Sequence, residues 1–238
     1  MTKFERYLTA WPRYHRSKGF GIHSPFAFRF VLRVLRERCP YYAYASLDAK
    51  RGEVLAVPKR VRGKASHVAS RNEMRMLFRI ANCFNPQRML LLGEHCGLSA
   101  FALLSVSSKS EMRLWKSDYD GSLAAATLSG FGNRIEVDSS VEKAFDAYLG
   151  DCGGSMPFVV VSHVPSDEAA VSERLLALAS GERDAIVVVR NLSTDDAVRR
   201  IWKSMLGASQ SGMSFSNGKT GVFVASSKLP LQHFSLWF

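Results

Sequence analysis

The chain contains 238 residues, 47% of them hydrophobic, and has a formal net charge of +11. This length and apolar content suit one globular domain with an extension and argue against a disordered chain. No run of about 18 apolar residues occurs, and the first residues lack the apolar region of a signal peptide, so we expect a cytoplasmic protein without a transmembrane segment.

The excess positive charge lies in the amino-terminal quarter of the chain. Residues 1–64 hold 15 Lys and Arg against 4 Asp and Glu, whereas the remainder holds 17 of each. Aromatic residues are interleaved with these cations, among them Trp11, Tyr14, Phe20 and Phe26. Such a segment can contact nucleic acid, an anionic membrane surface or an acidic partner. The alternative is a solvated helical face.

Four cysteines are spread along the chain: Cys39, Cys83, Cys96 and Cys152. Their spacing lacks the C-x-x-C pattern of a metal site, and their density is too low for a disulfide framework. We therefore expect reduced, mostly buried thiols.

Residues 1–68 are predicted to form a basic, partly helical extension. Ser24 suits the N-cap position and Pro25 the first helical position, so a helix is predicted from Pro25 to Arg36. Helices within Phe4–Arg36 should pack outside the sheet of the main domain. The segment Asp48–Val68 is basic and has little periodicity, and we interpret it as a linker or flap.

Residues 69–238 have the pattern of an α/β domain. Ser70 and Glu73 form a capping box ahead of a helix that ends near Asn85. Apolar runs then alternate with helical patterns, which is typical of a parallel sheet covered by helices on both faces. The predicted strands are 88–93, 112–117, 134–137, 158–161 and 185–189, and the predicted helices are 98–106, 123–128, 141–149, 168–178 and 197–206.

The carboxyl-terminal part differs from this alternation. Met213–Ser216 and Gly221–Ala225 flank a turn that contains Asn217 and Gly218, which predicts a hairpin. The last residues, 232–238, alternate like one more edge strand.

The stretch Met89–Ser99 predicts a buried strand, a turn with glycines at 93 and 97, and the start of a helix. Glycines let the backbone approach a ligand closely, so this turn is a hypothetical nucleotide site. The signal is unspecific, because the turn lacks the three-glycine dinucleotide fingerprint and glycine is also common in turns without ligands.

A glycine turn after the first core strand, an acidic residue after the second, five βα units and a closing hairpin together resemble the class I S-adenosylmethionine (SAM)-dependent methyltransferases. Within them, the chain resembles the O-methyltransferase-like proteins of Bacteroidetes over nearly its whole length. Gly21–Phe26 is similar to their amino-terminal signature, and Leu92–Ser99 resembles their E-L-G-x-x-x-G-x-S loop. Trp202 and Gln232–Phe234 also match. The resemblance implies a Rossmann-like sheet of order 3-2-1-4-5-7-6 with an antiparallel last hairpin.

The resemblance also implies a cofactor site. SAM would lie over the turn formed by Gly93, Glu94 and the residues up to Gly97, where free backbone N–H groups can donate hydrogen bonds. Asp118 stands at the end of the second strand, where an acidic side chain accepts hydrogen bonds from the ribose hydroxyls. The alternative for Asp118 is a solvated aspartate in a turn.

Three places depart from the family pattern. Family members carry a carboxylate two residues before Gly93, where this chain has Leu91, which cannot accept hydrogen bonds. Ser162–Pro165 replaces D-G-x-H after the fourth strand, and Arg190–Ser193 replaces D-D-I-H after the fifth. In metal-dependent O-methyltransferases such carboxylates hold a divalent cation. We therefore predict no metal at this site.

His163 and His95 are the remaining candidates for acid–base chemistry, since both are predicted at carboxyl ends of strands. We favour His163 as a base that deprotonates a substrate hydroxyl without metal. The alternative is a surface or hydrogen-bonded loop histidine.

Arg190 and Asn191 are predicted to bind the substrate. A fixed guanidinium suits a carboxylate or phosphate group, which indicates an anionic acceptor. The alternative is an Arg190 that pairs with a nearby acid such as Asp195 or Asp196.

Two functions follow from this sequence. The leading one is a SAM-dependent methyltransferase-like protein of the O-methyltransferase type, metal-independent, with activity that is retained, weakened or lost. The alternative is a non-catalytic scaffold with the same fold, whose basic residues 1–64 bind an acidic partner or nucleic acid.

Overall fold

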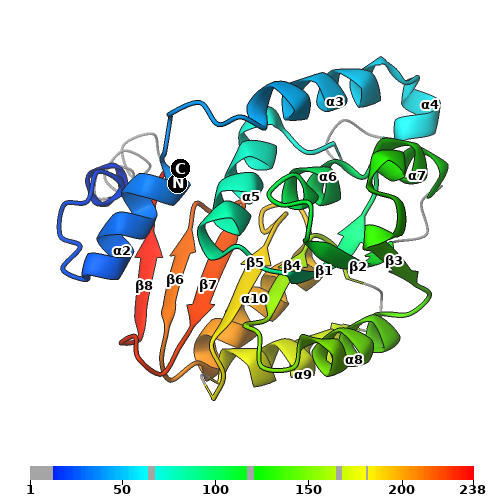
Figure 1. The fold of residues 1–238 in the computed structure, drawn as a ribbon. Coiled ribbons are helices and arrows are strands. Elements are labelled where there is room, and N and C mark those ends of the chain that lie inside the picture. Colours follow the sequence, from blue (N-terminus) through cyan, green and yellow to red (C-terminus); the bar gives the residue numbers. More distant parts are fainter. Residues whose placement is uncertain (1–12, 64–67, 117–120, 165–167, 181) are drawn as a thin grey trace.

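The structure, a computed structural model, describes residues 13–63, 68–116, 121–164, 168–180 and 182–238. Within these residues, eight strands form one sheet (Figure 1). They are β1 (Arg88–Glu94), β2 (Glu111–Lys116), β3 (Ile135–Asp138), β4 (Phe158–Val161), β5 (Ala185–Val189), β6 (Met213–Ser216), β7 (Gly221–Ala225) and β8 (Gln232–Ser235).

The strand order is β3-β2-β1-β4-β5-β7-β6-β8. Strands β1 to β5 are parallel to one another, and β7 is antiparallel to both β5 and β6. This confirms the predicted order 3-2-1-4-5-7-6 and the predicted hairpin. Strand β8 extends the sheet by pairing in parallel with β6, as the alternation in the last residues predicted.

Helices cover both faces of the sheet (Figure 1). One layer consists of α8 (Val141–Cys152), α9 (Glu168–Ala179) and α10 (Asp196–Ala208). The other layer contains α5 (Arg71–Phe84), α6 (Leu98–Leu104), α7 (Gly121–Leu128) and the extension, with the 3-10 segment η3 (Ser129–Arg134) leading into β3. No helix in the described part of the chain is long and apolar enough to cross a membrane.

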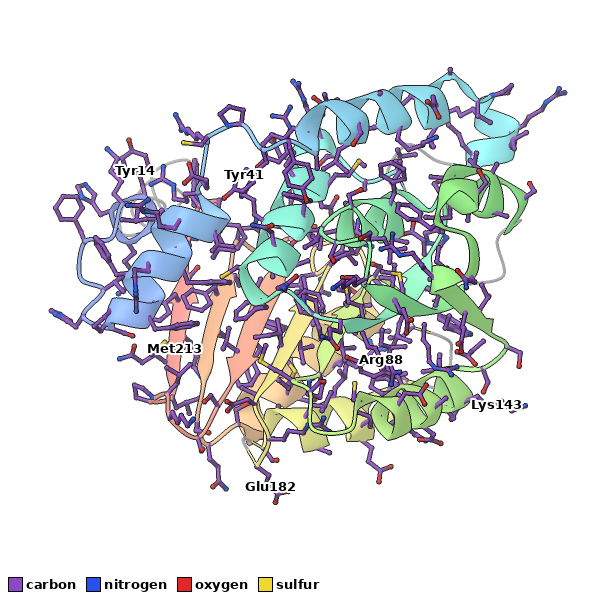
Figure 2. The ribbon with its side chains drawn as sticks, in the orientation of Figure 1. Tyr14, Tyr41, Arg88, Lys143, Glu182 and Met213 are labelled. Atoms are coloured by element: carbon purple, nitrogen blue, oxygen red, sulfur yellow. The ribbon has the colours of Figure 1, made fainter. Side chains whose placement is uncertain are left out.

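Each face of the sheet has its own hydrophobic core. Leu90 and Leu92 belong to the core shared with α8, α9 and α10, whereas Met89 and Leu91 belong to the core shared with α5 and α6. All four side chains are fully buried. A central parallel strand is covered on both sides, which explains its continuous apolar run. Figure 2 shows the side chains that fill the space between sheet and helices.

Short-range capping interactions fix where two helices begin. Ser24 Oγ accepts a hydrogen bond of 3.2 Å from the backbone N–H of Ala27, and Pro25 is the first residue of α2 (Pro25–Phe30). Ser70 and Glu73 form the predicted capping box at the start of α5. The structure confirms both predictions. They could be made from the sequence because each cap depends on residues within a single turn.

The interpretation of Asp48–Val68 as a linker or flap was wrong for most of that segment. Residues Tyr44–Ala56 form helix α3 and Lys59–Arg62 form the short helix α4. Within α3 only Tyr44, Leu47 and Val54 are buried. So few buried positions leave little apolar periodicity in the sequence, because one narrow face of the helix contacts the core.

The extension packs on the sheet and on α5. Helix α2 continues into a π-helical segment, η1 (Val31–Leu35), and Phe30 contacts Phe215 of β6 with ring centroids 4.9 Å apart. This agrees with the prediction of helices outside the sheet for residues 13–36, while residues 1–12 lie outside the described part. The division at residue 68 stays a prediction.

One buried cation holds the extension to the main domain. Arg79 of α5 is 8% exposed and donates to the carbonyls of Val34 and Leu35, at 2.5 and 2.9 Å, and to the hydroxyl of Tyr44 at 2.9 Å. The carbonyls at the end of a helix have no partner within it. Arg79 supplies that partner from α5.

We expect Arg79→Met to destabilise the protein by about 1–3 kcal/mol, since buried carbonyl oxygens would lose their donors. Urea unfolding followed by circular dichroism measures the change. The matched control is Arg33→Met, an exposed position on η1, where a change within about 0.5 kcal/mol is expected. Equal stability of the two variants would contradict the role assigned to Arg79.

Candidate functional site

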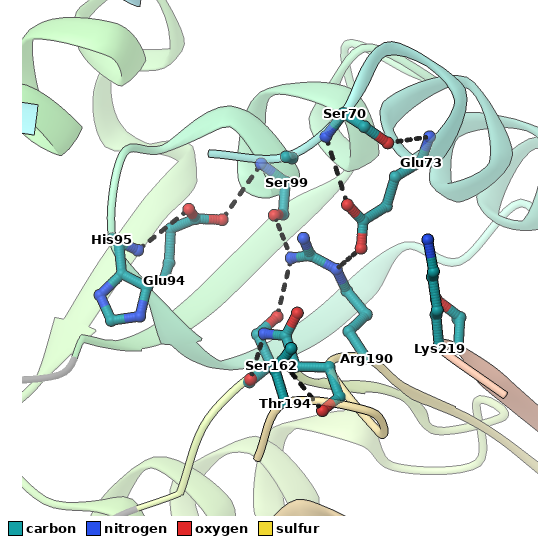
Figure 3. Close-up of polar contacts among 12 residues, drawn as sticks. Ser70, Glu73, Glu94, His95, Ser99, Ser162, Arg190, Thr194 and Lys219 are labelled. Carbon is teal, nitrogen blue, oxygen red and sulfur yellow. Dashed lines mark hydrogen bonds and ion pairs between the residues drawn. The ribbon is translucent and has the colours of Figure 1, made fainter. Parts of the chain in front are cut away.

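The predicted site residues come together where the carboxyl ends of β1, β4 and β5 meet. Glu94 ends β1, His163 follows β4, and Arg190 follows β5. Ligands of open α/β sheets bind at this edge, because the loops that leave parallel strands converge there. Figure 3 shows Glu94, His95, Ser162 and Arg190 in one cluster of polar side chains.

Arg190 is the centre of this cluster. Its side chain is 6% exposed, and its Nε donates to Oε1 of Glu73 at 2.9 Å. Its Nη1 donates to the hydroxyls of Ser99 and Ser162 (Figure 3). The guanidinium thereby connects α5, α6 and the ends of β4 and β5. Among the described residues, Nη2 of Arg190 donates no hydrogen bond.

The two charges of the Glu73–Arg190 pair stabilise each other. Burial by itself would lower the pKa of Arg190, but the nearby Glu73 carboxylate outweighs it and the pKa is raised. Burial by itself would raise the pKa of Glu73, yet Arg190 outweighs this effect and the pKa is lowered. Both groups are therefore ionised at neutral pH.

The alternative in which Arg190 pairs with a nearby acid named the wrong residues, Asp195 and Asp196. Arg190 does pair with an acid, but the acid is Glu73 of α5. Asp196 pairs with Arg199 one turn along α10, and Asp195 accepts from His163. The reason is geometric, since Arg190 points toward α5 and α6 whereas both aspartates belong to the start of α10.

His163 and Asp195 form a second polar pair at this edge. Nδ1 of His163 lies 2.8 Å from Oδ2 of Asp195, whose Oδ1 also accepts from the backbone N–H of Val198 at the start of α10. An ionised carboxylate only accepts hydrogen bonds, so Nδ1 carries the proton and Nε2 is the basic nitrogen. The His163 side chain is 42% exposed, and its ring centroid lies 6.1 Å from that of His95.

The two glycines of the turn are required by contacts within the protein. Gly93 has φ +82°, and a Cβ there would lie 2.5 Å from the backbone N of His163. Gly97 has φ +79°, and a Cβ there would lie 2.9 Å from Cβ of Thr127 in α7. A side chain at either position would therefore be strained and would collide with a neighbouring segment.

Glu94 satisfies the backbone N–H groups of the same turn. Its carboxylate is buried, with the residue 5% exposed. Oε1 accepts from the N–H groups of residues 95, 96 and 97, and Oε2 accepts from those of residues 99 and 100. The first turn of a helix attracts an anion. Here the chain supplies that anion itself.

The residues at the ends of β4 and β5 do not fit a divalent cation. Ser162 and Arg190 offer a hydroxyl and a cation, not the carboxylates that such an ion prefers, and Nδ2 of Asn191 donates to the Ser162 carbonyl at 2.8 Å. In the described ranges, no group of three or more His, Cys, Asp or Glu residues could hold a metal ion. Asp118, the predicted ribose ligand, lies outside the described residues.

The turn after β1 also contains a thiol. Cys96 follows Glu94 in the turn, and burial raises the pKa of its thiol to about 11, which keeps it protonated. Cys96 and Cys152 are buried, but Cys39 and Cys83 are exposed. The expectation of mostly buried thiols was therefore wrong for half of them, because two lie on outward-facing surfaces of the extension and of α5.

A cavity of about 330 Å³ lies elsewhere, where β1 and β2 begin. Its lining includes the ion pairs Arg88–Glu111 and Arg113–Asp151. Because these charges pair with each other at the opposite edge of the sheet, the cavity is no part of the candidate site.

No protein-family model and no curated protein matches the chain. Solved structures do match it. An O-methyltransferase from Bacillus cereus in complex with SAH is 17% identical, with a TM-score of 0.55 over 82% of this chain and 96% of that one. An SAH-bound methyltransferase from Podospora anserina is 13% identical, with a TM-score of 0.57 over 87% and 98%. The chain has the class I methyltransferase fold.

A third methyltransferase of this fold, an O-methyltransferase from Streptomyces achromogenes in complex with SAM, is 17% identical with a TM-score of 0.50 over 95% of this chain and 100% of that one. At such identities the likeness concerns the fold. In open α/β sheets ligands bind at the carboxyl ends of the strands, and the turn after β1 and the ends of β4 and β5 lie at that edge.

Sequence reasoning missed three interactions at this edge. It did not predict that Glu73 pairs with Arg190, that Asp195 orients His163, or that Glu94 accepts from the turn. The capping box had identified Glu73 as the start of a helix but not as an ion-pair partner. The position of Glu94 directly after Gly93 was a signal that its carboxylate could accept hydrogen bonds from the turn. No signal in the sequence pointed to the partners of Arg190 and His163.

We expect Glu73→Gln to lower the free energy of unfolding by about 2–4 kcal/mol, because it leaves the buried Arg190 charge without its partner. Glutamine can keep the capping box, so the change isolates the ion pair. Guanidinium unfolding measures the loss, and Glu73→Gln/Arg190→Met should recover part of it. Glu168→Gln breaks an exposed pair with Arg200 and should cost less than about 1 kcal/mol.

The same pair predicts a pH dependence. The pKa of Glu73 is lowered in the folded state, so its contribution is fully present above the unfolded pKa of about 4.3 and is lost as the pH falls through the folded pKa. The stability difference between wild type and Glu73→Gln should therefore shrink below about pH 4. If the stability difference between wild type and Glu73→Gln stays constant between pH 7 and pH 3, the ion pair is not its cause.

Proposed function

We propose that this protein is a SAM-dependent methyltransferase-like protein of the O-methyltransferase type that needs no metal. The proposal depends on one observation, the His163–Asp195 pair beside the Gly93 turn. It is supported by the fold, which SAM- and SAH-bound methyltransferases share. On this view the chain descends from proteins like those of Bacteroidetes and has exchanged their acidic and metal motifs for Leu91 and Arg190.

The residues at the site fit a carboxylate, the group at the methionine end of SAM. Nη2 of the buried Arg190 has no hydrogen bond to a described residue and can donate to it. The same donor suits an anionic acceptor, as the sequence predicted for Arg190 and Asn191. Gly93, Glu94 and Gly97 would form the floor of the cofactor site, and Asp118 would bind the ribose.

SAM supplies the methyl group when it is bound. The protein's part is to prepare the acceptor, and His163 is placed to do this because its Nε2 is basic and its side chain is partly exposed. Nε2 accepts the proton of the acceptor hydroxyl, while Asp195 holds the ring through Nδ1 and balances the positive charge that forms. Arg190 neutralises negative charge nearby without a metal ion.

A specific observation favours the alternative function, a non-catalytic scaffold. The Glu94 carboxylate already accepts the backbone N–H groups of the turn, so these groups are not available to a ligand. On that view Glu94 and Arg190 stabilise the fold, and residues 1–64 bind an acidic partner or nucleic acid. Whether the protein binds SAM distinguishes the methyltransferase from the scaffold.

We expect the full-length protein to bind SAM in a calorimetric titration. Asp118→Ala should weaken binding by about 10- to 150-fold, since charge-assisted hydrogen bonds contribute about 1.5–3 kcal/mol. The control is Asp146→Ala on α8, where the carboxylate pairs with Arg174 away from this edge. Equal binding by Asp118→Ala and wild type would remove the assignment of Asp118. Absence of binding by the wild type would support the scaffold function.

We also expect methyl transfer to a hydroxybenzoate acceptor to be unchanged by a chelator or by added magnesium, because Arg190 occupies the position of a cation ligand. His163→Gln should reduce kcat by about 100- to 10,000-fold with little change in SAM affinity, as for the loss of a general base. A clear magnesium requirement would show that the site is misplaced. Full activity of His163→Gln would exclude this residue as the base.

A further inference from the structure

We propose that residues 13–38, together with Trp237, form a surface that docks on an anionic lipid bilayer. We call it the basic–aromatic face. It is separate from the candidate site and does not depend on SAM binding. Figure 1 places this segment, coloured blue, at one end of the sheet beside β8, and Figure 2 shows Tyr14 at the outer margin of the molecule.

Unpaired positive charge is the first property of this face. Residues 13–38 contain seven Lys and Arg and one acidic residue, Glu37. The Glu37 carboxylate accepts from the backbone N–H groups of residues 38 and 39. Among the described residues, no ion pair is formed by the exposed cations Arg16, Lys18, Arg29, Arg33 and Arg38. Such a cluster attracts an anionic surface within about a Debye length.

Exposed aromatic side chains are the second property. Phe20 is 63% exposed, Trp237 53%, Phe28 43% and Tyr14 40%. Leaving such large apolar surfaces in water is unfavourable unless they are covered in a complex. Trp, Tyr and Phe are the side chains that insert at the boundary between lipid head groups and hydrocarbon.

The segments that carry these aromatic groups lie next to one another. Phe20 contacts the ring of His15, and His15 contacts Tyr14. The Phe28 ring lies against the backbone of Gly19, directly before Phe20. The carboxyl terminus joins them, because the backbone N–H of Trp237 donates to Ser17 Oγ at 2.6 Å.

Hydrogen bonds and a buried side attach the face to the domain. Arg36 donates to the Ser17 carbonyl at 2.7 Å, and Arg13 donates to the Leu236 carbonyl at 3.4 Å. The opposite side of the same segment buries Ile22, Ala27 and Phe30 in the core. The exposed aromatic and basic groups are therefore positioned before a bilayer is met, which lowers the entropic cost of docking.

Composition favours a bilayer over nucleic acid. Residues 13–38 contain no Asn, Gln, Asp or Thr, and the side chains of Ser17, Ser24 and Glu37 already form hydrogen bonds with backbone groups, so few polar side chains are left to contact bases beside arginine. What the segment exposes is arginine, lysine and large apolar rings. That pairing matches a bilayer, in which anionic head groups lie directly above an apolar layer.

Co-sedimentation of the full-length protein with vesicles tests the proposal. Binding is expected to phosphatidylcholine vesicles that contain about 30% phosphatidylglycerol, and not to phosphatidylcholine alone, and it should weaken as salt screens the charges. Arg29→Glu/Arg33→Glu and Phe20→Ser/Phe28→Ser should each reduce binding at least about tenfold. Thermal unfolding of each variant verifies that it is folded.

Matched controls make the result specific to this face. Lys59→Glu/Arg60→Glu reverses the same number of exposed charges on α4, and Val137→Ser removes an exposed apolar group from β3. Both should bind vesicles like the wild type. Loss of binding in these controls, equal binding to neutral vesicles, or no binding to anionic vesicles would overturn the proposal. Binding of single-stranded RNA without binding of vesicles would overturn it in favour of a nucleic-acid surface.

Discussion

The Glu73–Arg190 ion pair is the interaction on which the polar cluster at the ends of β4 and β5 depends. It joins the cap of α5 to the end of β5, and through Ser99 and Ser162 it also holds α6 and the end of β4. A guanidinium in this position is a fixed positive charge that the chain carries itself. It pairs with the Glu73 carboxylate in a buried position, so each of the two charges has its partner within the protein.

The turn after β1 is likewise stabilised by a charged side chain of the protein itself, but here the charge is negative. Its backbone N–H groups are donors that could receive an anionic ligand, and the buried Glu94 carboxylate accepts from five of them. Gly93 and Gly97 allow His163 and α7 to approach the turn. Among the described residues, Nη2 of Arg190 donates no hydrogen bond, and the partly exposed ring of His163 presents Nε2. A basic nitrogen and a cationic donor at the same edge of the sheet suit the proposed deprotonation of an anionic hydroxyl compound.

The extension contributes to a different part of the molecule. Arg79 and the buried face of α2 attach it to the domain, and its outward face concentrates unpaired cations and exposed aromatic rings. The net positive charge of the chain lies in residues 1–64, because residues 65–238 are formally neutral. The protein combines a domain whose polar groups at the strand ends largely pair with one another and an extension in which, among the described residues, the exposed cations Arg16, Lys18, Arg29, Arg33 and Arg38 form no ion pair. The proposed docking of the extension on a bilayer is thus compatible with a domain that is a methyltransferase and with one that is a non-catalytic scaffold.

The sequence by itself determined the elements whose signals are local. The Ser70–Glu73 capping box, the apolar runs of the central strands and the Met213–Ala225 hairpin each depend on neighbours in the chain, and the structure confirms them. The order of the strands was implied by the family resemblance and not by these local signals. Helix α3 was missed because it buries few positions. Only the tertiary structure decided the site, because Arg190 lies 117 residues from Glu73 and His163 lies 32 residues from Asp195. Parallel strands bring such distant residues to one edge, and which side chains pair there is set by the direction in which each strand end points.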